Sequence, residues 1–153
     1  CKDGEKMIKE FVKKFTEEEI IEFNKIVKIS QECYIVEETL KELSKKTGRQ
    51  PLFIGRFLGK EGKIFKPSLW LLQEMAEKSD KKVVLYKDSE WKYICGRDVK
   101  VVGSQWSVVG GEDVEKDALV VNMFGECLGY GILKNNIVKN VFDIGDFLRR
   151  EKH

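Results

Sequence analysis

The spacing of apolar residues changes near residues 79–82, and this change constrains the fold more than any other feature of the chain. Ahead of it, apolar residues recur mainly every three or four positions, as on one face of an α-helix. Beyond it, short apolar runs alternate with glycines, and seven of the thirteen glycines fall between Gly96 and Gly131. Such runs are typical of a small barrel or a strongly bent sheet. We therefore predict an α+β protein with an N-terminal domain over residues 1–80 and a C-terminal, β-rich domain over residues 81–153.

The first domain is expected to contain helices and one hairpin. Thr16 and Glu19 have the spacing of a capping box, in which each side chain accepts a hydrogen bond from the other's backbone amide. Gly48 ends a second helical periodicity, and Pro67 suits the first turn of a third helix. The predicted elements are helices over residues 16–27, over residues 36–47 and from Pro67 onward, and hairpin strands over residues 52–59 and 64–65.

Three strands are predicted in the second domain. Residues 83–86 are a short apolar run, residues 118–124 are a longer one, and residues 127–133 are a third. Between the last two runs, Gly125 and Glu126 suit a two-residue type II′ turn. The second and third strands should therefore form a hairpin.

The sequence does not support an enzyme. The only histidine is the terminal His153, so no catalytic triad is expected. Gly129 and Gly131 lack the third glycine of a dinucleotide-binding fingerprint, because Lys134 stands at that position. No glycine-rich phosphate-binding loop occurs either. We therefore predict no catalytic residue and no cofactor.

The four cysteines are not spaced as metal ligands. Cys1, Cys33, Cys95 and Cys127 are widely separated, and no Cys-x-x-Cys pair occurs. A structural zinc site needs four nitrogen or sulfur ligands, usually in close-spaced pairs. No signal peptide is visible, so we predict no metal site and free, buried thiols in a reducing cytoplasm.

The charges nearly balance, with 28 lysines and arginines against 26 aspartates and glutamates, a net charge of +2. That balance excludes a uniformly basic protein held on nucleic acid by bulk charge, so a nucleic-acid site must use local charge. The longest uncharged run, residues 101–111, is shorter than the about 20 apolar residues that a membrane span needs. No membrane partner is expected.

Positive charge gathers in two places. Residues 45–66 hold seven lysines and arginines against the single acidic residue Glu61, and phenylalanines lie between them. Cations on a stiff hairpin suit a surface that follows phosphates, while the alternative is a solvated face that balances acidic residues 17–19. The second cluster ends the chain, where a helix dipole favours cations with or without RNA. The candidate residues are Arg49, Arg56, Lys60, Lys63 and Lys66 in the first cluster and Arg149, Arg150 and Lys152 in the second.

The second domain also contains four short motifs in a fixed order. They are Ile94-Cys95-Gly96-Arg97-Asp98-Val99, Gly110-Gly111-Glu112-Asp113-Val114, Ala118-Leu119-Val120-Val121 and Leu128-Gly129-Tyr130-Gly131. In this order they resemble a PUA domain, the small RNA-binding pseudobarrel named after pseudouridine synthases and archaeosine transglycosylases. The resemblance implies a C-terminal PUA β-pseudobarrel that follows an N-terminal α/β domain.

Three further segments narrow the resemblance from PUA domains in general to one family. They are Phe15-Thr16-Glu17-Glu18-Glu19, Pro51-Leu52-Phe53-Ile54-Gly55-Arg56-Phe57-Leu58-Gly59 and the ending Phe142-Asp143-Ile144-Gly145-Asp146-Phe147-Leu148-Arg149-Arg150. Together they are similar to an archaeal-type member of the nuclear-import-protein-seven family, which consists of a pre-PUA domain and a PUA domain. The resemblance implies a non-enzymatic factor in large ribosomal subunit biogenesis and pre-rRNA processing. A monomer is expected, in the cytoplasm or, in a eukaryote, in the nucleus or nucleolus, with ribosome-assembly or exosome-associated proteins as partners.

The resemblance also implies where RNA binds. In PUA domains RNA lies against a glycine-containing loop, here near Gly96, and against the last strand. Single-stranded or looped RNA, such as a uridine-rich segment of precursor ribosomal RNA, is expected because its splayed bases are accessible. The RNA-binding residues implied here are Gly96, Arg97, Lys134, Lys139, Arg149, Arg150 and Lys152.

Two other functions are consistent with the sequence. The second half of the chain carries 10 positive and 11 negative charges, which favours a protein-interaction adaptor whose PUA domain serves mainly as a scaffold. An accessory domain of an RNA-modifying enzyme is a further alternative, but it needs a catalytic module that this chain does not contain. Measurable binding to RNA at low salt would favour the RNA-binding factor over the adaptor.

Overall fold

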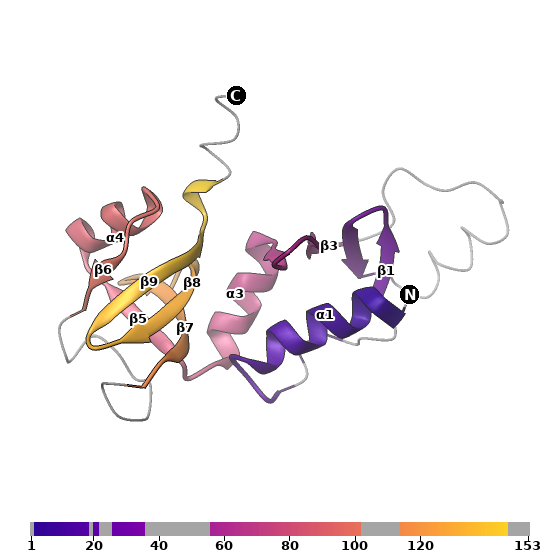
Figure 1. Ribbon diagram of the computed structural model, residues 1–153, viewed down its shortest axis with the longest axis horizontal. Helices are drawn as coiled ribbons and strands as arrows, with labels where there is room; N and C mark the ends of the chain where they lie inside the picture. The colour runs from indigo at the N-terminus through magenta and orange to yellow at the C-terminus, as the bar shows by residue number, and fades with distance from the viewer. Residues whose placement is uncertain (1, 19, 22–25, 36–55, 102–113, 147–153) are drawn as a thin grey trace, which may run out of the picture. The chain divides into compact units, whose positions relative to one another are not determined.

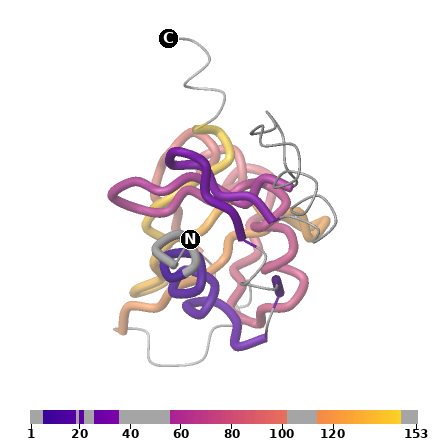
Figure 2. Tube along the Cα trace, turned by 90° about the vertical axis from the view of Figure 1, so that its right-hand side faces the viewer, coloured from indigo at the N-terminus to yellow at the C-terminus, as the bar shows by residue number. Residues whose placement is uncertain are grey.

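The computed structural model describes residues 2–18, 20–21, 26–35, 56–101 and 114–146, which are coloured in Figure 1 and in Figure 2. Over these residues the chain is an α+β protein, as predicted, with three helices, a four-stranded antiparallel sheet and a curled, five-stranded mixed sheet that forms half a barrel. It separates into two compact units. Unit 1 comprises residues 1–13 and 17–71, and unit 2 comprises residues 14–16 and 72–153.

Unit 1 begins with helix α1 (Lys2–Lys13), which the sequence analysis did not predict. Ile8, Phe11 and Val12 occupy one face of the helix and are buried. The Phe11 ring packs against the Phe65 ring, with 5.2 Å between the ring centroids. Burial of this apolar face holds the helix in place, since most helical stability in proteins comes from such packing.

The helix predicted over residues 16–27 is wrong, because the described residues 16–18 and 20–21 are not helical and the segment ends in a strand. That strand is β1 (Ile26–Ile29), which forms an antiparallel hairpin with β2 (Glu32–Ile35). Three β-branched residues in a row of four favour a strand over a helix, because their χ1 rotamers are restricted in helices. Ser30 takes a left-handed conformation with φ of 58° in the tight turn. Glu19, the second half of the predicted capping box, lies outside the described residues.

The four strands of unit 1 follow in the order β1-β2-β3-β4. Strands β3 (Arg56–Lys60) and β4 (Lys66–Pro67) form the predicted hairpin, although its second strand begins two residues later than expected. Residues 52–55 of that prediction and the helix predicted over residues 36–47 lie outside the described residues.

Helix α3 (Leu69–Lys78) confirms the third predicted helix and corrects its start. Pro67 belongs to β4, and the Ser68 hydroxyl accepts a hydrogen bond from the Leu71 amide at 3.1 Å. Serine at this position satisfies one of the amides that a helix start leaves unpaired. The helix therefore begins at a serine cap rather than at proline.

Unit 2 contains the five-stranded sheet, with strand order β5-β7-β8-β9-β6. Strand β5 runs parallel to β7, and the other pairs are antiparallel. Figure 1 shows β8 and β9 side by side as a long hairpin. The elements are β5 (Lys82–Leu85), helix α4 (Lys87–Ile94), β6 (Val99–Lys100), β7 (Lys116–Asn122), β8 (Cys127–Lys134) and β9 (Ile137–Asp143).

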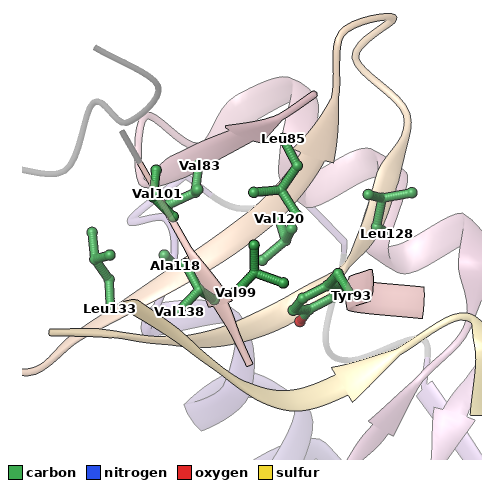
Figure 3. Close-up of a cluster of buried hydrophobic side chains, with 10 residues drawn as sticks. All are labelled: Val83, Leu85, Tyr93, Val99, Val101, Ala118, Val120, Leu128, Leu133 and Val138. Atoms are coloured by element: carbon green, nitrogen blue, oxygen red, sulfur yellow. The ribbon is translucent and has the colours of Figure 1, made fainter. Parts of the chain in front are cut away.

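The concave side of this sheet encloses the core of unit 2. Figure 3 shows ten buried side chains that come from all five strands, from α4 and from the residue after β6. Tyr93 of α4 is the largest of them and is fully buried. Its hydroxyl lies 2.7 Å from the Tyr130 carbonyl oxygen and 2.8 Å from the Phe142 carbonyl oxygen. A single side chain therefore ties the helix to both strands of the long hairpin.

The strands predicted over residues 83–86, 118–124 and 127–133 are confirmed as β5, β7 and β8. The turn between the last two is not the predicted pair Gly125–Glu126. It spans residues 123–126, since the Asn122 amide donates to the Glu126 carbonyl at 3.0 Å and closes a four-residue loop. The apolar residues at 123 and 124 extended the predicted strand too far, because apolar character alone does not separate a strand from an exposed turn.

The sheet curls at two register shifts. One lies between Val120 and Val121 of β7, and the other lies between Tyr130 and Gly131 of β8. Such bulges bend a strand and increase its twist. Gly129, with φ of 151°, lies beside both shifts, and a Cβ atom there would collide with the Phe142 carbonyl oxygen. The β9 backbone is so close to residue 129 that the hairpin requires glycine at that position.

In the part of the chain that the structure describes, no helix is both long and apolar enough to cross a membrane.

Candidate nucleic-acid interface

The end of helix α4 places the Gly96-Arg97 segment on the surface. The Gly96 amide donates to the Tyr93 carbonyl at 2.9 Å, and the Arg97 amide donates to the Lys92 carbonyl at 3.2 Å. This hydrogen-bond pattern is a Schellman cap, which needs a left-handed residue after the helix. Gly96 supplies it with φ of 89°. The chain turns sharply there, and Arg97 follows with an exposed side chain.

Asp98 fixes this loop against strand β9. Its Oδ1 atom accepts a hydrogen bond from the Asn140 amide at 2.9 Å. The Asn140 side chain in turn donates to the Tyr93 carbonyl at 2.8 Å, at the end of α4. Two hydrogen bonds between the loop region and one residue of β9 hold the loop beside Lys139, the preceding residue of that strand.

Strand β6 continues from the loop and pairs with β9. Lys100 is opposite Ile137, and Lys134 of β8 is opposite Ile137 on its other side. Residues directly opposite each other in neighbouring strands point to the same face. Lys139 lies two residues beyond Ile137 and therefore also points to that face. Lys100, Lys134 and Lys139 thus surround Ile137 on the outer face of the sheet, and we call these four residues the basic face.

All four side chains of the basic face are exposed, and Ile137 is 47% exposed. None of its three lysines forms an ion pair with another residue that the structure describes. Two carboxylates lie near this face. Asp98, next to strand β6, is opposite Lys139 by the β6–β9 register and accepts the hydrogen bond from the Asn140 amide, and Asp117 of β7 lies in the same row as Ile132 and Lys139. Together with Arg97, the lysines outnumber these carboxylates and form a local positive surface in a unit whose positive and negative charges are equal in number.

No family model matches this chain, and no curated protein matches it. The interface is therefore assigned from its own residues and geometry. Gly96, Arg97, Lys134 and Lys139, which were predicted from the sequence, all belong to unit 2 and lie on the loop and strands just described. The other predicted residues, Arg149, Arg150 and Lys152, lie outside the described residues.

Lys100 was not predicted, although the structure places it on the edge strand β6, directly opposite Ile137 of the basic face. Its signal in the sequence is local: Val99 and Val101 are buried on either side of the exposed Lys100. This alternation is that of a strand with one face in solvent. With only two residues in the strand, the pattern is too short to be recognised until the pairing with β9 is known.

The second predicted patch lies in unit 1 and is only partly a free basic surface. The Arg56 guanidinium lies 4.8 Å from the centre of the Trp70 ring, a cation–π distance. Lys60 and Lys66 are direct partners in the β3–β4 pair, and Lys63 is exposed in the turn between these strands. Arg49 lies outside the described residues. Three lysines on one hairpin therefore remain as a secondary patch.

A shallow hollow lies along α4, and Trp91, with 66% of its surface exposed, is its largest apolar residue. Among the described residues it is lined by that helix alone. Lys87 and Lys92 face it together with Asp88 and Glu90, so its charges balance. The hollow therefore does not extend the basic face.

The thiols differ in accessibility and give a chemical test of the fold. Cys33 and Cys127 are buried as predicted, whereas the prediction is wrong for Cys95, which is exposed next to Gly96. Burial raises the pKa of the Cys33 thiol to about 11 and that of the Cys127 thiol to about 12. Thiolates are the reactive form, so both buried cysteines should be inert at neutral pH.

We expect iodoacetamide at pH 8 to alkylate Cys95 at least about 100-fold faster than Cys33 or Cys127, because a thiol must be both accessible and ionised to react. Mass spectrometry of the digested protein at successive times measures each rate. Alkylation in denaturant, where the three sites should react at similar rates, is the control. Equal rates in the native protein would contradict the burial of Cys33 and Cys127.

Proposed function

We propose that this protein is a non-enzymatic RNA-binding factor that holds single-stranded or looped RNA on the basic face and the adjoining Gly96-Arg97 loop. The observation that carries the proposal is the convergence of three exposed lysines from three strands around Ile137. Lysines at fixed positions bind phosphates, and each contact releases counterions from the nucleic acid. The exposed isoleucine between them offers an apolar surface to an unstacked base.

The rigidity of the surface also supports RNA binding. The loop is held by Asp98, by Asn140 and by the helix cap, so Arg97 is attached to ordered backbone. A preorganised site loses less conformational entropy when a ligand binds. The three neighbouring strands of the basic face are about 10 Å across, a width that suits a few consecutive nucleotides rather than a long duplex.

We further propose that the five-stranded unit is a PUA domain and that the four-stranded unit is a pre-PUA domain. The motifs that suggest this are those around Gly96 and Gly129, and both lie at turns or bulges of unit 2. A role in large ribosomal subunit maturation follows from the same resemblance. The RNA would then be precursor ribosomal RNA, and ribosome-assembly or exosome-associated proteins would be partners.

The charge reversal Lys100→Glu, Lys134→Glu and Lys139→Glu tests the interface. We expect the triple variant to bind a uridine-rich oligonucleotide about 30-fold more weakly than the unaltered protein at low salt. Each phosphate contact on a single strand contributes a slope of about −0.7 to the dependence of log affinity on log salt, so the slope should flatten by about 2. Fluorescence anisotropy with a labelled oligouridine measures both quantities.

A matched control reverses three exposed lysines elsewhere, Lys6→Glu, Lys78→Glu and Lys87→Glu, and changes the net charge by the same amount. This control should keep its salt slope. Equal losses in both triple variants would contradict a localised site. If the unaltered protein shows no RNA binding at low salt and co-purifies stoichiometrically with an assembly protein, the adaptor hypothesis replaces this proposal.

A further inference from the structure

The turn between β7 and β8 exposes two large apolar side chains. Phe124 is 86% exposed and Met123 is 63% exposed. Burying either side chain would contribute about 1.5–3 kcal/mol, which the isolated chain does not gain. Single exposed apolar residues are ordinary on protein surfaces, so exposure alone does not indicate binding.

The turn is held in one conformation by the buried side chain of Asn122. Its Oδ1 atom accepts hydrogen bonds from the amides of Phe124 and Glu126, both at 3.0 Å. Its Nδ2 group donates to the Glu90 carboxylate of α4 at 3.2 Å and to the Glu126 carboxylate at 3.3 Å. The turn is thus fixed both to itself and to the neighbouring helix.

Helix α3 supports the turn from another direction. The Gln73 side chain donates to the Gly125 carbonyl at 3.1 Å and accepts from the Cys127 amide at 3.1 Å. Both Gln73 and the turn belong to unit 2. The chain therefore uses two amide side chains from different elements to hold an exposed phenylalanine in place. Rigid, protruding aromatic residues of this kind are typical of binding anchors, because little entropy is lost when they dock.

A second aromatic side chain adjoins the turn. The parallel pairing of β5 with β7 ends at Leu85 and Asn122, so Tyr86 and Met123 leave the sheet side by side. Tyr86 is 49% exposed. We call Tyr86, Met123 and Phe124 the apolar knob.

Acidic residues outnumber basic ones around the apolar knob, since Lys87 directly follows Tyr86 but Asp88, Glu90 and Glu126 lie in the same segments. No lysine or arginine occurs between Lys116 and Lys134, so the whole β7–β8 hairpin lacks positive charge at its turn. The carboxylates of Glu90 and Glu126 both hydrogen-bond to Asn122 at the base of the turn. Phosphates would be repelled there, whereas a protein surface with lysines or arginines would be attracted.

The apolar knob and the basic face lie at opposite ends of strand β8. The turn precedes Cys127, the first residue of the strand, and Lys134 is the last. Eight residues of strand span roughly 25 Å. A partner at the apolar knob and RNA at the basic face would therefore not compete for the same surface.

We propose that the apolar knob docks into an apolar pocket of a protein partner whose pocket is bordered by lysine or arginine. Phe124 enters the pocket, Tyr86 and Met123 cover its edge, and the carboxylates of Glu90 and Glu126 face the partner's cations. This surface is separate from the RNA interface and does not depend on the proposed function.

Photo-crosslinking identifies the partner. The full chain, with benzoylphenylalanine in place of Phe124, is expressed in the cells that make this protein and irradiated, and the crosslinked species is identified by mass spectrometry. We expect a crosslink to another protein. That protein is then purified, and calorimetry measures its affinity for the unaltered full chain and for Phe124→Ser, which should bind about 30-fold more weakly as a central anchor does.

Several controls keep the result interpretable. Met123→Ser should weaken binding by a smaller factor, while Val114→Ser, which removes another side chain that is 55% exposed in the same unit, should leave affinity unchanged. Oligouridine binding by Phe124→Ser should equal that of the unaltered protein. A crosslink to RNA, to a second copy of this chain or to no protein would overturn the proposal. So would an affinity of Phe124→Ser within threefold of the unaltered value, or loss of its oligouridine binding.

Discussion

Tyr93→Ala is expected to lower the free energy of unfolding by about 4 kcal/mol, because it removes the largest fully buried side chain of unit 2. Truncating a buried aromatic residue to alanine typically costs 3–5 kcal/mol, from lost burial and from the cavity left behind. The cavity would lie between α4 and the β8–β9 hairpin, where the ring packs. Urea denaturation followed by circular dichroism measures the loss of stability.

Tyr93→Phe separates the hydroxyl from the ring. The hydroxyl bridges two carbonyl oxygens that lie next to the register shift of the hairpin. Its removal leaves both carbonyls without this donor in a buried site, so we expect a loss of about 1–3 kcal/mol while the ring still fills the core. A phenylalanine variant as unstable as the alanine variant, or as stable as the unaltered protein, would contradict this division.

The phenylalanine variant also has a pH signature. Burial, reinforced by the nearby Asp143 carboxylate, raises the pKa of the Tyr93 hydroxyl well above its ordinary value of 10.0. The unfolded chain therefore loses this proton first as the pH rises above 10, and stability falls over that range. Tyr93→Phe should show a shallower alkaline decline in the free energy of unfolding. Some decline should remain, since burial raises the pKa of Tyr130 to about 12.

Periodicity predicted the β-rich part of this fold well and the N-terminal part poorly. The runs that became β5, β7 and β8 are apolar over several consecutive residues and bounded by glycine or charge, a pattern typical of buried strands. Residues 16–27 carry signals for both a helix cap and a strand. There, pairing of β1 with β2 prevails over local helical spacing, since tertiary contacts routinely override propensity.

In the candidate site, too, contacts between distant residues decide what local sequence patterns do not reveal. Gly96, Arg97, Lys134 and Lys139 were predicted as site residues because motifs mark their surroundings, whereas Lys100 belongs to a strand of only two residues. What brings Lys100 beside Lys134 is the pairing of β6 and β8 on opposite edges of β9. That arrangement joins residues far apart in the sequence, so spacing along the chain does not reveal it. The apolar knob was not predicted either. In the sequence, Met123 and Phe124 continue an apolar run and therefore resemble the end of a buried strand.

Gly129→Val is expected to be about as damaging as Tyr93→Ala, with a loss of about 4 kcal/mol. A Cβ atom at residue 129 would collide with the Phe142 carbonyl oxygen and approach the Asp143 Cα atom to 2.9 Å. Both contacts are backbone, which cannot rotate away, so β8 and β9 would have to separate. The φ of 151° adds strain, because residues with a side chain rarely adopt it. Overpacking and strain together account for the expected size.

Gly62→Val is the matched control for Gly129→Val. Among the residues that the structure describes, a Cβ atom at residue 62 would meet the Ile64 carbonyl oxygen alone, at the ordinary contact distance of 3.5 Å. Its loss should stay below about 1 kcal/mol in the same urea titration. Equal losses in the two variants would show that glycine matters here through the flexibility of the unfolded chain rather than through close packing of the hairpin. A loss confined to Gly129→Val, together with weaker oligouridine binding at matched folded fraction, would instead show that the spacing of β8 and β9 positions the lysines of the basic face.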